Sequence, residues 1–146
     1  MTQAPQDKWV AFPLASSGTV TNATVKSAIF KNWFYKGALV VVNRKSETGT
    51  CTMAVKLTGY LMDDDDVEYE WDVAGAAIVS YADGATGVRY FMLYPGATGS
   101  DADGVIAKST NFNLVNDALP QQFRIAVTHG GTSVSNTFSV RVYPLT

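Results

Sequence analysis

The sequence predicts an all-β fold, an antiparallel β-sandwich or jelly roll of about eight strands that follows an N-terminal arm. Apolar and polar residues alternate with a period of two in several separate segments. This is the pattern of strands that have one face in a core and one face in water. Clusters of Gly, Pro, Asp, Asn and Ser separate these segments at the short intervals that are typical of turns between strands.

The chain has 146 residues, which is the length of one domain. We expect residues 1–23 to form a polar, Pro-bearing arm with an irregular lead-in, and residues 24–146 to form a single β-sandwich domain. Two hypotheses remain for Trp9 and Phe12 of the arm. Either they dock the arm on a neighbouring protein, or they cover the bottom of their own sandwich.

The strands follow from the pattern of apolar residues. Segments 38–42 and 88–94 are apolar on both faces and predict central strands, or strands whose outer face is covered. One-sided alternation predicts half-buried strands at 51–58, 67–73, 122–128 and 137–142. The last two are close enough in sequence to pair as a hairpin. The only helical pattern, at 113–119, is stopped by Pro120.

Turn-forming residues predict where the chain reverses between these strands. The predicted turns are at 45–49, 63–66, 82–87, 95–104 and 129–135.

Residues that usually carry catalysis are few. His129 lies in a Thr-His-Gly-Gly tract between two predicted strands, so we expect it to be a turn residue. Cys51 falls on the inward register of a strand, where a thiol acts as a small hydrophobic group. A single cysteine also excludes an internal disulfide and fits assembly in a reducing cytoplasm. We therefore expect no catalytic residue and no enzymatic activity.

Metal and cofactor motifs are also missing from the pattern. The four consecutive Asp residues at 63–66 lack the alternate spacing and the Gly of a calcium loop. Asp101 and Asp103 come closer to that spacing, but no Glu follows at the distance that an EF-hand needs. The Gly-bearing loops 84–88 and 96–100 precede neither a helix nor a Lys-Ser/Thr pair. We expect neither a metal nor a cofactor.

Charge and hydropathy exclude two classes of partner. The net charge is −2 without a basic stripe, which argues against a nucleic-acid partner. The longest apolar runs are shorter than the roughly 18 residues that cross a bilayer, and the N-terminus lacks the pattern of a signal peptide. Charged residues make up 16% of the chain, below the roughly 25% of typical soluble domains. Such a surface is either covered by partners or rich in Thr, Ser, Asn and Gly.

Three consecutive aromatic residues, Trp33, Phe34 and Tyr35, precede Gly37. Side chains alternate along a strand, so three successive rings cannot all face one core. At least one ring must point away from the core, and exposed rings of this kind mark contacts with sugars or proteins. The alternative is a ring that folds over the edge of the sandwich.

Four tracts together are similar to a known class of proteins. They are Tyr-Lys-Gly leading into Ala-Leu-Val-Val-Val-Asn at 35–43, Leu-Tyr-Pro-Gly at 93–96, Asn-Asp-Ala-Leu-Pro followed by Phe-Arg-Ile-Ala-Val-Thr-His at 116–129, and Thr-Phe-Ser-Val at 137–140. In this order and spacing the chain resembles head decoration (cement) proteins of tailed bacteriophages, over about residues 33–142. The resemblance implies a β-rich module that binds the major capsid protein on the outside of the capsid, commonly as a trimer, and stabilises the head.

We therefore expect a virion structural protein on the capsid surface, assembled in the host cytoplasm and not secreted through a signal peptide. Its expected protein interface consists of five aromatic residues: Trp9, Phe12, Trp33, Phe34 and Tyr35. Two alternatives remain. One is a phage tail or neck subunit, which would share this composition. The other is a carbohydrate-binding β-sandwich that uses Trp33, Tyr35 or Tyr94 as stacking platforms.

Overall fold

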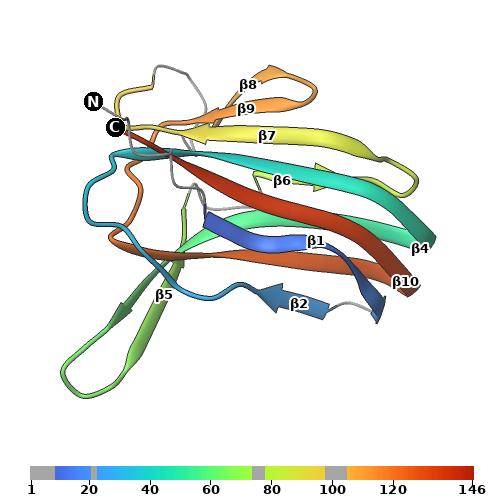
Figure 1. The fold of residues 1–146 in the computed structure, drawn as a ribbon, viewed down its shortest axis with the longest axis horizontal. Helices are drawn as coiled ribbons and strands as arrows, with labels where there is room; N and C mark the ends of the chain where they lie inside the picture. The colour runs from blue at the N-terminus through green and yellow to red at the C-terminus, as the bar shows by residue number, and fades with distance from the viewer. Residues whose placement is uncertain (1–8, 21–22, 74–77, 98–104) are drawn as a thin grey trace, which may run out of the picture.

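The computed structural model describes residues 9–20, 23–73, 78–97 and 105–146. All regular structure in these residues is β-strand, which confirms the predicted all-β class. No helix long and apolar enough to span a membrane occurs among them. The strands are β1 (Trp9–Val20), β2 (Ala23–Lys26), β3 (Phe30–Lys31), β4 (Gly37–Met62), β5 (Glu68–Asp72), β6 (Val79–Tyr81), β7 (Gly87–Leu93), β8 (Val105–Ser109), β9 (Phe112–Val115) and β10 (Gln122–Leu145). All of them except the two-residue β3 are labelled in Figure 1.

The fold is built on one long antiparallel ribbon formed by β4 and β10. Its register runs from the pair Gly59–Phe123 at one end to the pair Gly37–Leu145 at the other. The remaining strands pair along its two edges in the order β1-β10-β4-β7-β9-β8, while β2 and β3 also pair with β10, and β5 and β6 with β4. Because β7 and β9 are parallel, the sheet is mixed rather than purely antiparallel, and a jelly-roll topology stays a prediction.

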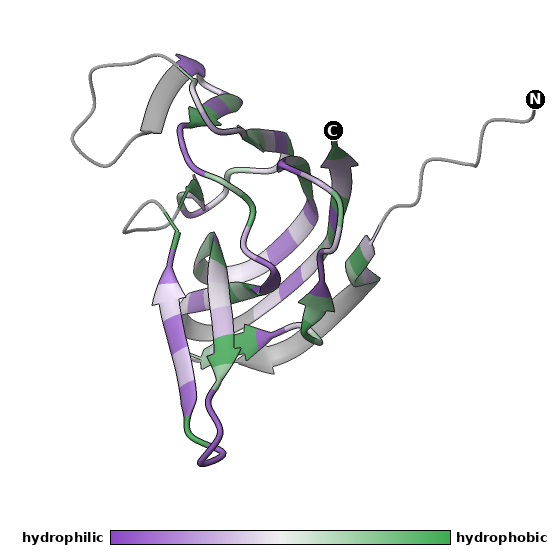
Figure 2. Cartoon of the chain, turned by 90° about the vertical axis from the view of Figure 1, so that its left-hand side faces the viewer, coloured by the Kyte–Doolittle hydropathy of each residue, from purple (hydrophilic) through white to green (hydrophobic). Residues whose placement is uncertain are grey.

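The sheet folds over on itself, so that the two halves of the ribbon face each other across the core (Figures 1 and 2). Trp9 of β1 pairs with the second half of β10, yet its ring contacts Phe123 in the first half, with centroids 5.4 Å apart. Likewise, the hydroxyl of Tyr81 in β6 donates a hydrogen bond of 3.2 Å to the carbonyl of Val42 in the first half of β4. These contacts join the two layers into a sandwich-like fold.

The predicted alternation places the core correctly in the ribbon strands. The inward residues at 53, 55 and 57 of β4 and at 123, 125 and 127 of β10 are all almost completely buried. The same holds for residues 138, 140 and 142, and the apolar segment 38–42 is a central strand. The largest fully buried apolar side chains are Tyr81, Phe91, Phe123, Met53, Leu57, Leu93 and Ile125.

The predicted turns at 129–135 and at 45–49 are wrong, and so is the predicted hairpin between the segments 122–128 and 136–143. Both of these segments belong to the continuous strand β10, and both pair with β4 rather than with each other. The second supposed turn, at 45–49, lies inside β4. Gly49 and Gly131 adopt positive φ angles of 80° and 121°, so both strands of the ribbon bend together where a turn was expected. The predicted turns at 63–66 and 82–87 are confirmed.

The predicted arm needs a correction as well. Residues 9–20 form strand β1, which pairs antiparallel with the second half of β10, while residues 1–8 and 21–22 of the predicted arm lie outside the described part of the chain. Trp9 and Phe12 supply the reason, since both rings pack against the core from the edge of the sheet. The segment with a helical pattern also differs, because residues 112–115 form strand β9, which is parallel to β7.

Candidate functional site

The structure separates the five aromatic residues that were expected to form an interface. Trp9 lies against Tyr35 and Phe30, with ring centroids 5.9 and 6.1 Å apart, and Phe12 lies against Phe138 at 5.6 Å. These contacts place Trp9, Phe12 and Tyr35 on the core. The alternative hypothesis, that Trp9 and Phe12 cover their own sandwich, therefore agrees with the structure, in which both rings pack against the core.

Trp33 and Phe34 are instead exposed, with 65% and 86% of their surface accessible. They lie in a bend between β3 and β4 rather than in a strand, so neighbouring rings can point in similar directions. Asn32 holds this bend. Its Oδ1 accepts a hydrogen bond from the backbone of Tyr35 at 2.9 Å, and its Nδ2 donates to the carbonyl of Tyr35 at 2.8 Å. We call residues 31–36 the aromatic loop.

A second exposed apolar surface was not predicted from the sequence. Strand β5 and the end of β4 form a hairpin that extends away from the rest of the sheet (Figures 1 and 2). Leu61, Val67, Tyr69 and Trp71 of this hairpin are 47–51% exposed. The prediction that 67–73 has one face in the core is therefore wrong for all of its inward residues except Val73. Alternation shows that a strand has an apolar face, but it does not show whether anything covers that face.

The inner face of the hairpin continues the core face of the sheet. Residues that pair across antiparallel strands point to the same side. Gly59 pairs with both Trp71 and the buried Phe123, and Leu61 pairs with Tyr69 one step further out. Trp71, Tyr69 and Leu61 therefore prolong the core side beyond the end of the sandwich. We call these three residues the hairpin face.

The base of the hairpin is fixed on its opposite side by Glu70. Its carboxylate accepts two hydrogen bonds from Arg124 of β10, of 3.0 and 2.6 Å, and one of 2.7 Å from the hydroxyl of Thr58. The ammonium of Lys26 in β2 lies 3.0 Å from the same carboxylate. Arg124 first, and then Thr58 and Lys26, hold the pKa of Glu70 well below its usual value. This network ties three neighbouring strands to β5.

The tip of the hairpin is acidic and ordered. Oδ1 of Asp63 accepts backbone hydrogen bonds from Asp65 and Val67, both of 2.9 Å, and Oδ2 accepts one from the hydroxyl of Tyr69 at 3.2 Å. The bond from Val67 is the main reason why the pKa of Asp63 lies below its usual value. The side chains of Asp64, Asp65 and Asp66 are exposed, and Figure 2 shows this tip as hydrophilic.

Strand pairing brings the aromatic loop and the hairpin face to the same end of the sandwich. Phe30, Phe123, Gly59 and Trp71 lie side by side on β3, β10, β4 and β5. The aromatic loop begins just after Phe30, and the hairpin extends just beyond Trp71. Together the two surfaces form the apolar end of the molecule, which is our candidate binding site.

His129 and Cys51 are both fully buried, next to the bend in the ribbon. Nδ1 of His129 is 2.8 Å from Nδ2 of Asn136, and the Cys51 thiol donates to Oδ1 of Asn136 at 3.3 Å. The same Oδ1 accepts a hydrogen bond of 2.8 Å from the buried Arg44. The prediction that His129 is a turn residue is thus wrong, while the predicted burial of Cys51 is confirmed.

The geometry of this buried group bears on its chemistry. Cys, His and Asn occur together in some nucleophilic sites, but a nucleophile must reach its substrate. Cys51 has no accessible surface, and burial together with the positive charge of Arg44 lowers the pKa of His129. Arg44 also donates to the carbonyls of Ala82 and Ala85, at 2.9 and 2.8 Å. The group therefore holds the bend and the 82–87 turn together.

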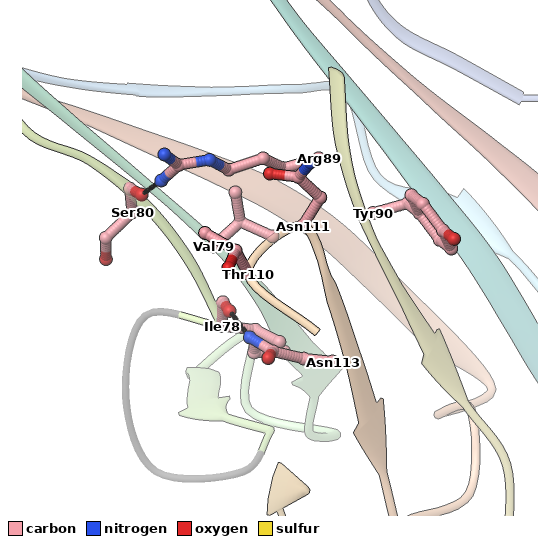
Figure 3. A pocket seen from close by; sticks show the side chains of 8 residues that line it. All are labelled: Ile78, Val79, Ser80, Arg89, Tyr90, Thr110, Asn111 and Asn113. Atoms are coloured by element: carbon pink, nitrogen blue, oxygen red, sulfur yellow. Dashed lines mark hydrogen bonds between the residues drawn. The ribbon is translucent and has the colours of Figure 1, made fainter. Parts of the chain in front are cut away.

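A shallow cavity of about 270 Å³ lies between β6 and the β7–β9 pair (Figure 3). Two of its polar side chains already have partners, because Arg89 donates to the carbonyl of Ser80 and Asn113 to that of Ile78. The guanidinium of Arg89 also lies 4.4 Å from the ring centroid of Tyr81. The described residues contain no group of three or more metal-ligating side chains, and Asp101 and Asp103 lie outside them.

Comparison of this chain with protein-family models, with curated protein sequences and with solved structures finds no match.

Proposed function

We propose that this chain is a non-enzymatic structural protein that binds other protein subunits through its apolar end. The observation that carries the proposal is the exposure of Trp33, Phe34, Tyr69 and Trp71 on two surfaces at one end of the fold. Trp and Tyr are the residues that most often dominate the binding energy of protein interfaces. Clusters of large exposed apolar side chains are uncommon on monomers and mark interaction sites.

Both surfaces are held in place before any partner binds. Asn32 fixes the aromatic loop, Glu70 and Trp71 fix the base of the hairpin, and Asp63 fixes its tip. A preorganised surface loses little conformational entropy on binding. Burial of a single large ring such as Phe34 would contribute about 1.5–3 kcal/mol before those costs.

Within this class we propose a head decoration protein that binds the major capsid protein on the outer surface of a tailed-phage capsid as a homo-oligomer, with a trimer as the expected state. The support is the similarity of the tracts at 35–43, 93–96, 116–129 and 137–140 to such proteins. Of the expected interface residues, Trp33 and Phe34 remain exposed and available to other subunits, whereas Trp9, Phe12 and Tyr35 support the fold.

The structure weighs unevenly on the alternatives. A tail or neck subunit would need the same apolar end, so only an experiment can distinguish it from a head decoration protein. A carbohydrate-binding role loses two of its three platforms. Tyr35 packs against Trp9, and Tyr94 is half-buried with its hydroxyl bonded to the carbonyl of Thr146 at 3.0 Å. Of these three residues, only Trp33 is left as a freely exposed platform.

Co-sedimentation tests the proposal. The purified full chain is mixed in parallel with expanded capsids of the parent phage, with its isolated tails and with an insoluble polysaccharide. We expect saturable binding to capsids, a fixed number of copies per capsid, and greater capsid resistance to heat. Binding to tails alone would replace the head role by the tail role. Retention by polysaccharide alone, or by none of the three, would overturn the proposal.

A further inference from the structure

Charges of opposite sign lie next to the apolar side chains of the two surfaces, positive at the aromatic loop and negative at the hairpin. Lys31 and Lys36 flank Trp33 and Phe34, and both lysines are exposed. None of the ion pairs among the described residues involves either lysine. The loop is therefore an apolar pair of rings between two available positive charges.

The hairpin has the complementary arrangement. Beyond its base, the hairpin face of Leu61 and Tyr69 ends at the exposed carboxylates of Asp64, Asp65 and Asp66. No Lys or Arg occurs between Gly59 and Asp72. Among the acidic residues in this range, Glu70 and Asp72 are the ones that take part in the ion pairs found among the described residues. The hairpin is therefore an apolar strip next to a negatively charged tip.

These two complementary surfaces do not cover each other within one molecule. Phe34 keeps 86% of its surface accessible and Trp33 keeps 65%, while Tyr69 keeps 50%. The ring contacts among the described residues include none between the loop and the hairpin. Each surface thus presents exposed apolar side chains and charges, and the rest of the described chain does not cover them.

We propose that a second copy of this chain covers these surfaces, with the aromatic loop of one copy docked on the hairpin face of the next. Phe34 and Trp33 would contact Leu61 and Tyr69, while Lys31 and Lys36 would lie near the Asp64–Asp66 tip. This inference rests on the proposed function, because it names one partner of the same apolar end. Two different patches meet, so the contact is heterologous, and its repetition gives a closed ring or an open chain.

Charge reversal tests the contact, with mass measured by analytical ultracentrifugation over a range of protein concentrations and at low and high salt. One variant carries Lys31→Glu and Lys36→Glu, and a second carries Asp64→Lys and Asp65→Lys. The backbone of Asp65, not its side chain, bonds to Asp63, so these changes leave the turn intact. A third variant combines all four changes. The control is Lys45→Glu with Lys108→Glu, which alters net charge as much as the first variant does.

We expect the wild type to self-associate, and each single-surface variant to associate at least about ten-fold more weakly. The combined variant should recover to within about three-fold of wild type, because both charges of every contact are then exchanged. The control should associate like wild type, and high salt should weaken wild-type association. Unfolding midpoints show that each variant is folded.

Three results would overturn the inference: a wild type that stays monomeric at every concentration, single-surface variants that associate normally, or a combined variant that does not recover. Each is independent of capsids. A monomer that still coats capsids would remove this inference and the proposed homo-oligomer but leave capsid binding. An oligomer that does not bind capsids would leave this inference and remove capsid binding.

Discussion

The indole of Trp71 lies directly over the backbone of Gly59, so closely that a Cβ atom on Gly59 would be 2.2 Å from its ring. Only glycine allows this approach, because any other residue would place its side chain inside the indole. The contact fixes the base of the hairpin on its inner side, opposite the Glu70 network. The position of the hairpin thus depends on a residue with no side chain.

We predict that Gly59→Ala displaces Trp71 and costs about 1–3 kcal/mol in the free energy of unfolding, as overpacking does. Tryptophan fluorescence and denaturant unfolding measure both effects. The matched experiment combines Gly59→Ala with Trp71→Ala, which removes the ring that the new methyl group meets. The alanine should then be almost neutral relative to Trp71→Ala alone. Equal costs in both backgrounds would show that the indole does not lie on Gly59.

Removal of Glu70 should loosen the same hairpin from its other side. Arg124 is the main reason why the pKa of Glu70 is lowered in the folded protein. The carboxylate therefore stabilises the fold at pH values above 4.5, which is its pKa in the unfolded chain, and this stabilisation is lost as the pH falls below that value. We expect Glu70→Gln to reduce stability at neutral pH by about 1 kcal/mol or less, since the network is partly solvated. The difference from wild type should shrink toward low pH. A difference that grows on acidification would contradict this assignment.

His129 should make the fold sensitive to mild acid. Burial, and then Arg44, lower its pKa below the unfolded value of 6.5. Below that pH the unfolded chain binds more protons than the folded one, so the free energy of unfolding falls as the pH falls. Denaturant titrations between about pH 5 and pH 8 measure this slope, within the range in which histidine titrates. His129→Gln should make the free energy of unfolding depend less on pH below pH 6.5. An unchanged slope would assign the effect to other groups.

Ile125 tests the register of the central ribbon. Its side chain is fully buried, opposite Leu57 of β4. We expect Ile125→Ala to cost about 2–5 kcal/mol through lost transfer free energy and a cavity. Val88, which is half exposed, offers the control, and Val88→Ala should change stability by less than about 0.5 kcal/mol. A similar small change at Ile125 would mean that the strand is shifted by one residue.

The sequence predicted the strands of the ribbon well, because a two-residue period is a local property. It failed where the outcome depends on distant segments. The Gly130-Gly131 pair has the composition of a turn, but β4 stays paired through it, and the strand bends instead. Whether Trp9 joins the core depends on Phe123 and Tyr35 from other parts of the chain, which no local pattern reveals.

The candidate site shows the same division. The three successive rings at 33–35 correctly indicated that some would be exposed, and Trp33 and Phe34 are. The hairpin was missed because Tyr69 and Trp71 alternate with acidic residues just as the strands of a core do. The one available signal was the Asp run at 63–66. It predicts a tip in water, and a strand attached to such a tip can extend beyond its sheet.

The central claim is that the apolar end binds protein subunits of the virion. The most direct test is the affinity for expanded capsids of a variant with Phe34→Ala and Tyr69→Ala, measured by co-sedimentation beside wild type and Val88→Ala, whose exposed side chain lies away from this end. We predict that the double variant keeps its unfolding midpoint but loses at least about ten-fold in affinity, as loss of aromatic anchors does, while Val88→Ala binds normally. A folded double variant that binds capsids as tightly as wild type would contradict the claim.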